Sequence, residues 1–423
     1  MTAIADIPTG SQKKRVPVLD GIRGVCALGV LFTHVAFATF VQASNASENS
    51  RDIWAILAAG QLSLGPFFVL SGLLLYRPFA RRAFGDAPRP ALGKFYLRRA
   101  SRILPAFWLV VTVDLVLLNA SAITGVWDVL RPYLLLHIYD FHYYAGMDVL
   151  WTVPTEIQFY ALLPVLAWVM HRLAKGVADP AAKARRMIAP LGVFVAAEYA
   201  WTIYIHGAFE MWPSQYFYPL SVCSLFAIGM AMAVWSAQSE VSERPAALHR
   251  AALARPGLFW LGALAFYALN CAQPFSTPGT SDWLSPEAAV IRHLCMFFFS
   301  FLIMVPLVVP GATTGYMKNV LGNPVLVFLG RISYGIYLWH FTVMYFRFES
   351  GSVFGEIVPV QMLIGKFGFW DLFLTVTAGT IVLSTLSYYL FEQPIIRFVE
   401  KRVKWRGQPP VEDAAPQRAP AGV

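Results

Sequence analysis

The chain has 423 residues, of which 57% are hydrophobic, 15% aromatic and only 13% charged, and its mean hydropathy is +0.55. Soluble domains contain about a quarter charged residues, so this composition excludes an ordinary soluble enzyme. The net charge of +9 falls in every second connecting loop, which excludes a nucleic-acid-binding surface and indicates membrane topology.

Apolar segments long enough to cross about 30 Å of hydrocarbon recur along the chain. We therefore predict an all-α, polytopic transmembrane bundle of about ten spanning helices. One membrane domain is expected over 16–398, between a cytoplasmic segment, 1–15, and a disordered cytoplasmic tail, 399–423. The predicted spans are 18–40, 54–76, 103–120, 150–170, 187–204, 217–236, 257–272, 288–310, 325–346 and 369–391.

Basic residues mark alternate loops. The loop between the second and third spans is rich in Lys and Arg and holds one acid, Asp86, so it is expected to face the cytoplasm. An even number of spans then places both termini inside, in the plasma (inner) membrane. The four cysteines lie in or beside apolar runs, without the close pairs of a disulfide framework or zinc site, and we expect no metal.

Asp20, Arg23 and His34 interrupt the first span. An ionisable side chain inside a membrane helix costs roughly 2.5–3.5 kcal/mol, so it needs a partner or a function. Arg23 and His34 are about three turns apart and share one helix face, roughly 16 Å apart along the axis. Two interpretations stay open for this helix: a polar functional seam, or an interfacial Asp20–Arg23 pair with a hydrogen-bonded core histidine.

The second and third spans offer a hydroxyl and a pair of cations. Ser71, in PFFVLSGLLLY, is a candidate substrate contact or simply a close-packing residue. Arg99 and Arg102, in FYLRRASRILP, are spaced to hold a phosphate, and Arg331 near the ninth span is a third candidate. Basic residues at helix ends also often only set orientation and contact lipid headgroups.

The fourth span begins WTVPTEIQFY and carries Glu156 just after Pro154. Counting inward along this helix and outward along the first predicts that Glu156 and His34 lie at similar depth in the outer half of the membrane. A buried carboxylate beside an imidazole fixes its tautomer and favours a general base. The alternative is that Glu156 faces the outer water.

The ninth span reads GRISYGIYLWHF and forms a polar stripe of Ser333, Tyr337 and His340 at i, i+4 and i+7. Tyr337 and His340 are candidate substrate contacts, as is Asp20. A satisfied core histidine and a packed tyrosine are the structural alternatives. Glu392, in FEQP after the tenth span, is expected to pair with a basic loop.

The order of these motifs, LDGIRG with its Arg-x10-His spacing, FFVLSG, RRASRILP, WTVPTEIQFY, GRISYGIYLWH and FEQP, resembles the acyltransferase-3 family of bacterial membrane O-acyltransferases. The resemblance covers about residues 16–398. By it, His34 matches the essential histidine of the family and Arg23 its arginine partner. Arg99 and Arg102 match the paired arginines that serve the coenzyme A side.

The resemblance implies transfer of an acyl group, commonly acetyl, from cytoplasmic acyl-CoA to a hydroxyl of a carbohydrate, glycolipid or other envelope molecule. His34, oriented by Glu156, would deprotonate that hydroxyl or carry the acyl group itself. The rival interpretation is a transporter or flippase for an envelope precursor, because intramembrane His, Glu and Arg also build transport pathways. Neither the acceptor, the acyl length nor the oligomeric state can be read from the sequence.

Overall fold

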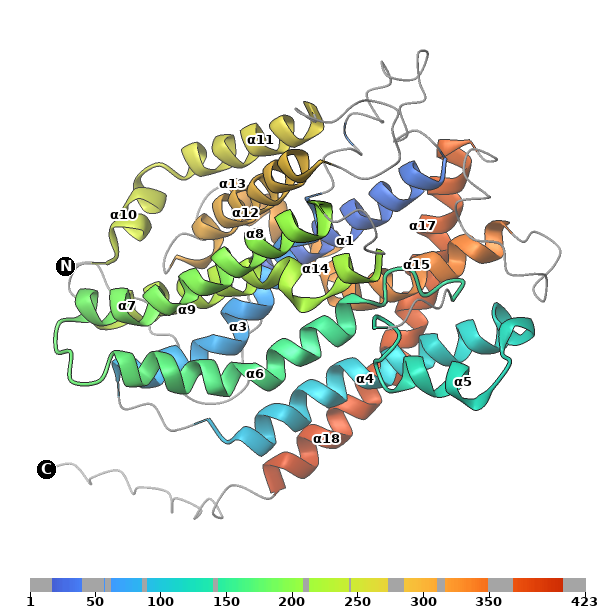
Figure 1. The fold of residues 1–423 in the computed structure, drawn as a ribbon, viewed down its shortest axis with the longest axis horizontal. Coiled ribbons are helices and arrows are strands. Elements are labelled where there is room, and N and C mark those ends of the chain that lie inside the picture. The colour runs from blue at the N-terminus through green and yellow to red at the C-terminus, as the bar shows by residue number, and fades with distance from the viewer. Residues whose placement is uncertain are drawn as a thin grey trace, which may run out of the picture.

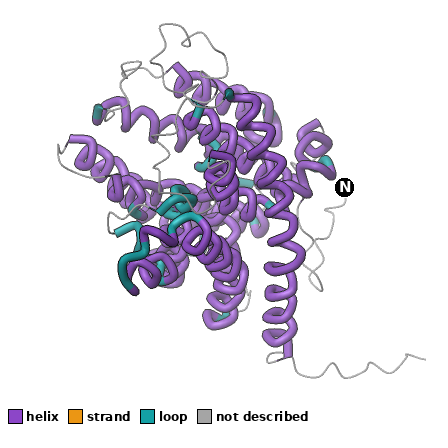
Figure 2. Tube along the Cα trace, turned by 90° about the vertical axis from the view of Figure 1, so that its right-hand side faces the viewer, coloured by secondary structure: helices purple, strands orange, loops and turns teal. Residues whose placement is uncertain are grey.

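The computed structural model describes residues 17–39, 57, 62–85, 90–139, 144–207, 213–242, 245–272, 285–309, 316–348 and 368–405. Within these ranges the protein is an all-α bundle (Figures 1 and 2). The expected N-terminal segment, 1–15, lies outside them. Helix α18 continues to Trp405, past the expected start of the tail at 399, and the remainder of that tail is not among the described residues.

The first half of the chain forms α1 (Pro17–Ala38), α3 (Gly65–Phe84), α4 (Leu92–Leu117), η2 (Ala120–Ala122), α5 (Val126–Tyr133), α6 (Thr152–Leu173), α7 (Pro180–Ile188), η3 (Ala189–Leu191) and α8 (Gly192–Gly207). The second half forms η4 (Pro213–Phe217), η5 (Pro219–Val222), α9 (Cys223–Val241), α10 (Ala247–Ala254), α11 (Pro256–Ala272), α12 (Pro286–Val308), α13 (Tyr316–Leu321), α14 (Pro324–Arg331), α15 (Ser333–Phe348), α17 (Phe369–Leu386), η6 (Ser387–Glu392) and α18 (Gln393–Trp405).

The described residues confirm a helical, multi-pass membrane bundle. Seven helical runs in these ranges are long and apolar enough to cross a membrane, and the bent pair α10 and α11, at 95°, would make an eighth. The predicted ninth span, 325–346, is instead two helices, α14 and α15, which meet at Ile332. In the predicted second span, 54–76, helix α3 begins at Gly65 and continues to Phe84, and most of 54–61 lies outside the described ranges. The described ranges therefore hold seven or eight candidate spans, against about ten expected along the whole chain.

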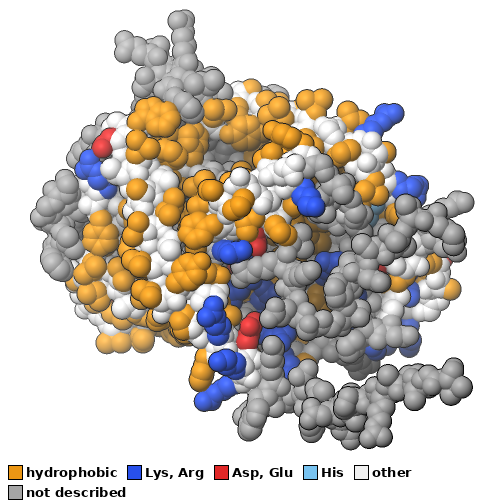
Figure 3. Space-filling view, turned by 180° about the vertical axis from the view of Figure 1, so that it is seen from behind, with side chains coloured by type: hydrophobic (Ala, Val, Ile, Leu, Met, Phe, Trp, Pro, Cys, Tyr) orange, Lys and Arg blue, Asp and Glu red, His pale blue; other side chains and the backbone are white. Residues whose placement is uncertain are grey.

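The surface agrees with a membrane setting. Large apolar side chains are exposed along the helices, including Trp168 at 62%, Leu264 at 61% and Leu374 at 61%. Figure 3 shows apolar side chains covering the left half of that face, whereas Lys and Arg gather mainly below its centre and to the right. An apolar surface of this extent would be unstable in water and is normal in lipid.

Glycines allow several helices to pack at backbone contact. Helix α3 packs against α9, and a Cβ added at Gly229 would lie 2.1 Å from the Val69 carbonyl oxygen and 2.6 Å from the Leu73 nitrogen. Small residues of this kind are the usual means by which membrane helices approach closely. Gly72 faces the same contact, so the FVLSG motif contributes to packing at that position.

Helix α6 begins deep in the bundle. Figure 1 shows its first turn near the middle of the molecule, and the stretch before it, Tyr144–Leu150, is non-helical and almost wholly buried. Asn119 holds this stretch to the end of α4, because its amide donates to the Ala145 carbonyl (2.9 Å) and accepts from the Ala145 N–H (2.8 Å). Irregular backbone at membrane depth is tolerated where protein covers it. We call Tyr144–Leu150 the buried turn.

We predict that Gly229→Ala destabilises the bundle, because its methyl group would meet backbone atoms of α3 that cannot move alone. Overpacking of this kind costs about 1–3 kcal/mol. Thermal unfolding of the purified full chain in detergent should show a lower midpoint. Gly93→Ala is the matched control, since nothing lies within 4 Å of a Cβ there. Equal midpoints for the two variants would contradict the prediction.

Candidate active site

Two histidines from distant parts of the chain meet in the bundle. His34 on α1 and His340 on α15 are joined by a hydrogen bond of 2.9 Å between Nδ1 of His34 and Nε2 of His340. Their rings stack with centroids 5.1 Å apart and an interplanar angle of 18°. His340 is fully buried, and His34 retains some accessible surface. The imidazole of His34 therefore points at a neighbouring helix and not at lipid.

The hydrogen bonds of His340 fix the tautomers of both rings. Its Nδ1 lies 2.8 Å from the Tyr337 carbonyl oxygen and 3.1 Å from that of Ile336. A carbonyl oxygen only accepts, so Nδ1 must carry the proton, and Nε2 of a neutral ring is then an acceptor. Nδ1 of His34 consequently donates to it. The lone pair of His34 is left on Nε2, where no partner lies within the described part of the chain.

Glu156 does not take the place expected for it beside His34. The carboxylate of Glu156 accepts a hydrogen bond of 2.5 Å from Ser71 Oγ, and His34 is oriented by His340 instead. The reason lies in the fold: α6 begins deep in the bundle after the buried turn, so Glu156 lies in the region of Arg23, with which it interacts electrostatically. The expectation that Glu156 orients His34 was therefore wrong.

A second polar group gathers around Arg23. It combines Arg23, Arg99, Arg102, Glu156 and Tyr160, and we call it the inner cluster. Arg23 interacts electrostatically with Arg102, Glu156 and Tyr160, and Arg99 with Tyr160, Arg102 and Glu156. No ion pair shorter than 4.0 Å joins these groups in the described ranges. Three guanidinium groups thus converge without being neutralised by direct contact, an arrangement suited to phosphate oxygens.

The structure places the remaining candidates as follows. Asp20 lies one turn before Arg23 and interacts electrostatically with it. Arg331 is exposed at the end of α14, outside the inner cluster. The hydroxyl of Tyr337 donates to the Val149 carbonyl oxygen at 2.8 Å and is therefore occupied by the buried turn. The hydroxyl of Ser71 is likewise occupied by Glu156.

Tyr160 was missed by the sequence analysis, and for Tyr334 the partner of its hydroxyl could not be predicted. Tyr160 lies one helical turn after Glu156 and interacts electrostatically with Glu156, Arg99 and Arg23, so the i, i+4 spacing could have indicated it. Tyr334 donates its hydroxyl to the Ile103 carbonyl oxygen at 3.0 Å, which ties α15 to α4 beside Arg102. No sequence pattern around Tyr334 indicates this contact between helices.

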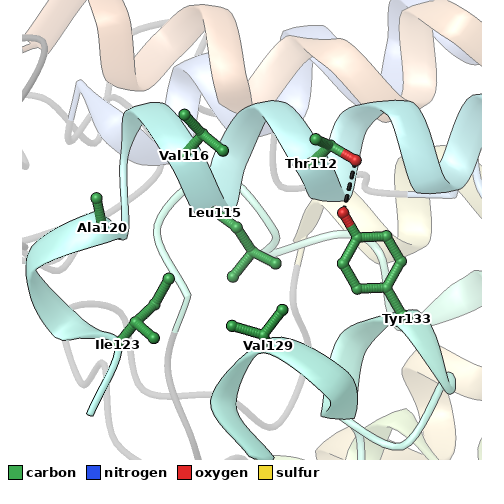
Figure 4. Close-up of a pocket in the computed structure, with 7 residues that line it drawn as sticks. All are labelled: Thr112, Leu115, Val116, Ala120, Ile123, Val129 and Tyr133. Atoms are coloured by element: carbon green, nitrogen blue, oxygen red, sulfur yellow. Dashed lines mark hydrogen bonds between the residues drawn. The ribbon is translucent and has the colours of Figure 1, made fainter. Parts of the chain in front are cut away.

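An apolar cavity of about 380 Å³ lies elsewhere, between α4, η2 and α5 (Figure 4). Leu115 and Val129 face each other across it, and the hydroxyls of Thr112 and Tyr133 hydrogen-bond at 2.6 Å at one side. It holds no ionisable side chain among its lining residues apart from Tyr133. It therefore lacks the acid–base groups that the histidine pair supplies.

Comparison with known proteins identifies the family of the chain. The sequence profile of the family described as "Acyltransferase domain" matches residues 16–389. The chain belongs to the acyltransferase-3 family. That assignment extends from α1 into the first residues of η6, and it includes both the histidine pair and the inner cluster.

The relatives have names that agree with the family. "Putative peptidoglycan O-acetyltransferase YrhL" of Bacillus subtilis is 29% identical over 90% of this chain and 55% of its own length. "Putative O-acetyltransferase SACOL0978" of Staphylococcus aureus is 25% identical over 93% and 59%, and "Nodulation protein 10" of Rhizobium leguminosarum is 25% identical over 78% and 81%. The chain thus spans little more than half the length of the first two. No solved structure matches it.

We predict that His340→Phe lowers acyl transfer by on the order of 10²-fold, because the neighbouring imidazole loses its acceptor and its fixed tautomer. The rate of coenzyme A release with purified full chain measures this. Phe341→Leu is the matched control, since that ring also packs on His34, at 4.9 Å, without a hydrogen bond. An equal loss in both variants would show that packing alone matters.

Proposed function

We propose that the protein transfers an acetyl group from acetyl-CoA to a hydroxyl of a cell-envelope carbohydrate. The observation that carries the proposal is the Nε2 lone pair of His34, which His340 orients and which has no hydrogen-bond partner among the described residues. Arg23, Arg99 and Arg102 lie toward the other end of α1 and make no ion pair within 4.0 Å in the same ranges. The names of the relatives favour acetyl as the acyl group, and one of them names peptidoglycan as its acceptor.

The donor is proposed to enter from the cytoplasmic side. Phosphates of coenzyme A would bind Arg99 and Arg102, with Arg23 deeper along α1. The exposed Arg331, outside the inner cluster, is a separate candidate contact for the nucleotide. Arg23 and His34 lie eleven residues apart, or roughly 16 Å along an α-helix. The pantetheine arm would cover this distance, so that the thioester reaches the imidazole while the nucleotide stays at the inner cluster.

The chemistry follows from the tautomer of His34. Its Nε2 removes the proton of the acceptor hydroxyl while the oxygen attacks the thioester carbonyl carbon. The tetrahedral intermediate then collapses, the carbon–sulfur bond breaks, and the imidazolium returns its proton to the departing thiolate. The alternative is that Nε2 accepts the acetyl group first. Labelled donor supplied without acceptor would label the protein only by this second route.

A transporter or flippase gains no support from the comparisons, because the matched family and the named O-acetyltransferases are acyl-transfer proteins. In this proposal the intramembrane arginines bind the acyl donor and His34 acts as the base, so these groups need no transport role. The described residues contain no group of three His, Cys, Asp or Glu that could hold a metal. The proposal therefore needs acyl-CoA, an acceptor and the surrounding lipid as its partners.

We expect His34→Ala to abolish acetylation, because it removes the base altogether. Mass spectrometry of envelope carbohydrate, peptidoglycan first, should show an acetyl increment that disappears in the variant. His171→Ala is the control, because this imidazole lies in the last turn of α6, outside both polar groups. An unchanged acetyl increment in His34→Ala would overturn the assignment of the base.

The donor site has its own test. Arg99→Gln and Arg102→Gln should each raise KM for acetyl-CoA by about tenfold, corresponding to loss of a charge-assisted contact worth roughly 1.4 kcal/mol. Turnover of acetyl-pantetheine, which lacks the nucleotide phosphates, should change little. Arg98→Gln, at an exposed neighbouring position, is the matched control. Equal effects on both donors would contradict phosphate binding at these arginines.

A further inference from the structure

The break between the last two helices carries a buried carboxylate. Helix α17 passes into α18 through η6, a π-helical turn of six residues, Ser387–Glu392. Single π turns are rare and are frequent at functional sites. Glu392, the last residue of the turn, is only 5% exposed.

Glu392 is oriented from within its own turn. Ser387 Oγ donates to Glu392 Oε1 at 3.1 Å, and the following residue, Gln393, donates its Nε2 to the Tyr388 hydroxyl at 2.5 Å. The turn is thus tied across its first and last residues. Because a buried carboxylate with a single hydroxyl donor is poorly compensated, a cationic neighbour is expected.

That neighbour is Arg102. Helix α4, which carries Arg102, packs against both η6 and α18, and Glu392 interacts electrostatically with Arg102. From α15, Tyr334 donates its hydroxyl to the carbonyl oxygen of Ile103, the residue after Arg102. Helices α4, α15 and α18 and the π turn are therefore neighbours around the stretch of α4 that carries Arg102. The pair is not in direct contact, since no ion pair within 4.0 Å joins Glu392 to Arg102.

The positive charges around Arg102 show why the Glu392 carboxylate matters. The guanidinium groups of Arg23 and Arg99 both repel that of Arg102. Arg102 itself is exposed and has a long, flexible side chain, so repulsion alone would favour its extension into the surrounding water. Glu392 opposes this from the side of the π turn. Because the attraction acts without a contact ion pair, the N–H groups of the guanidinium are left for another acceptor.

We propose that Glu392 is a positioning residue that holds the guanidinium of Arg102 at the inner cluster, where it meets a phosphate of acyl-CoA. This inference rests on the proposed function. The inference adds to that function a role for the π turn in donor affinity, without contact to the reacting atoms. The alternative is that Glu392 only completes the turn through its bond to Ser387.

The experiment separates these roles with two donors and two variants. Glu392→Gln keeps the size of the side chain and an oxygen for Ser387 but removes the charge. In the full chain, it should raise KM for acetyl-CoA about fivefold to tenfold, leave kcat within about twofold, and leave acetyl-pantetheine turnover unchanged. Ser387→Ala, which removes the bond and keeps the charge, should leave KM for acetyl-CoA within about twofold.

A double-mutant cycle completes the test. In the background of Arg102→Gln, Glu392→Gln should add less than twofold to KM, because the group that it positions has lost its charge. Independent, multiplying effects would overturn the inference, as would equal changes with both donors or an unchanged KM in Glu392→Gln. Thermal unfolding of each variant identifies a folding defect. Glu392→Asp keeps the negative charge that Glu392→Gln removes, so its KM for acetyl-CoA should lie closer to that of the unmodified chain.

The outcome for the proposed function stays distinct. If the unmodified chain does not consume acetyl-CoA with any envelope carbohydrate, the proposed function fails and the positioning role fails with it. If the unmodified chain is active and Glu392→Gln behaves identically, only the role of Glu392 fails.

Discussion

The hydrogen bond between His34 and His340 is the interaction on which the proposed chemistry depends. Lipid offers no partner to a polar side chain, so each ring must find its partner inside the protein. His340 obtains it from the backbone of its own helix, and His34 obtains it from His340. Among the described residues, His340 has partners on both ring nitrogens and His34 on only one. This asymmetry, and not the presence of a histidine as such, makes Nε2 of His34 available.

The bundle places different chemistry at two levels of α1. The histidine pair occupies its C-terminal half and the inner cluster its N-terminal half, and α1 packs against α14, α15 and α17 along its length. In the proposed function, donor recognition and proton removal therefore belong to opposite ends of one helix. A reactive thioester could then be presented far from the charges that bind its nucleotide, in keeping with the family to which the chain belongs.

Much of the arrangement could be predicted from the sequence. Hydropathy identified the helical membrane bundle, and the three-turn spacing of Arg23 and His34 placed them on one face. Helical periodicity says which residues share a face, but it does not say how deep a helix begins. The buried turn has no periodic pattern, and it moved Glu156 away from the level of His34. Both histidines could likewise be identified in the sequence. Their pairing, across 306 positions, could not be predicted, because it depends on which helices become neighbours.

Tyr337 has a consequence that reaches across the membrane domain. Its carbonyl oxygen anchors the ring of His340, and its hydroxyl anchors the backbone of the buried turn at Val149. A single residue thus fastens the base assembly to the irregular segment that leads into α6. Displacement of the buried turn would therefore act on the Tyr337 hydroxyl, and through the same residue on the hydrogen bond that anchors His340. The orientation of the two imidazoles is in this way coupled to the backbone that leads into α6.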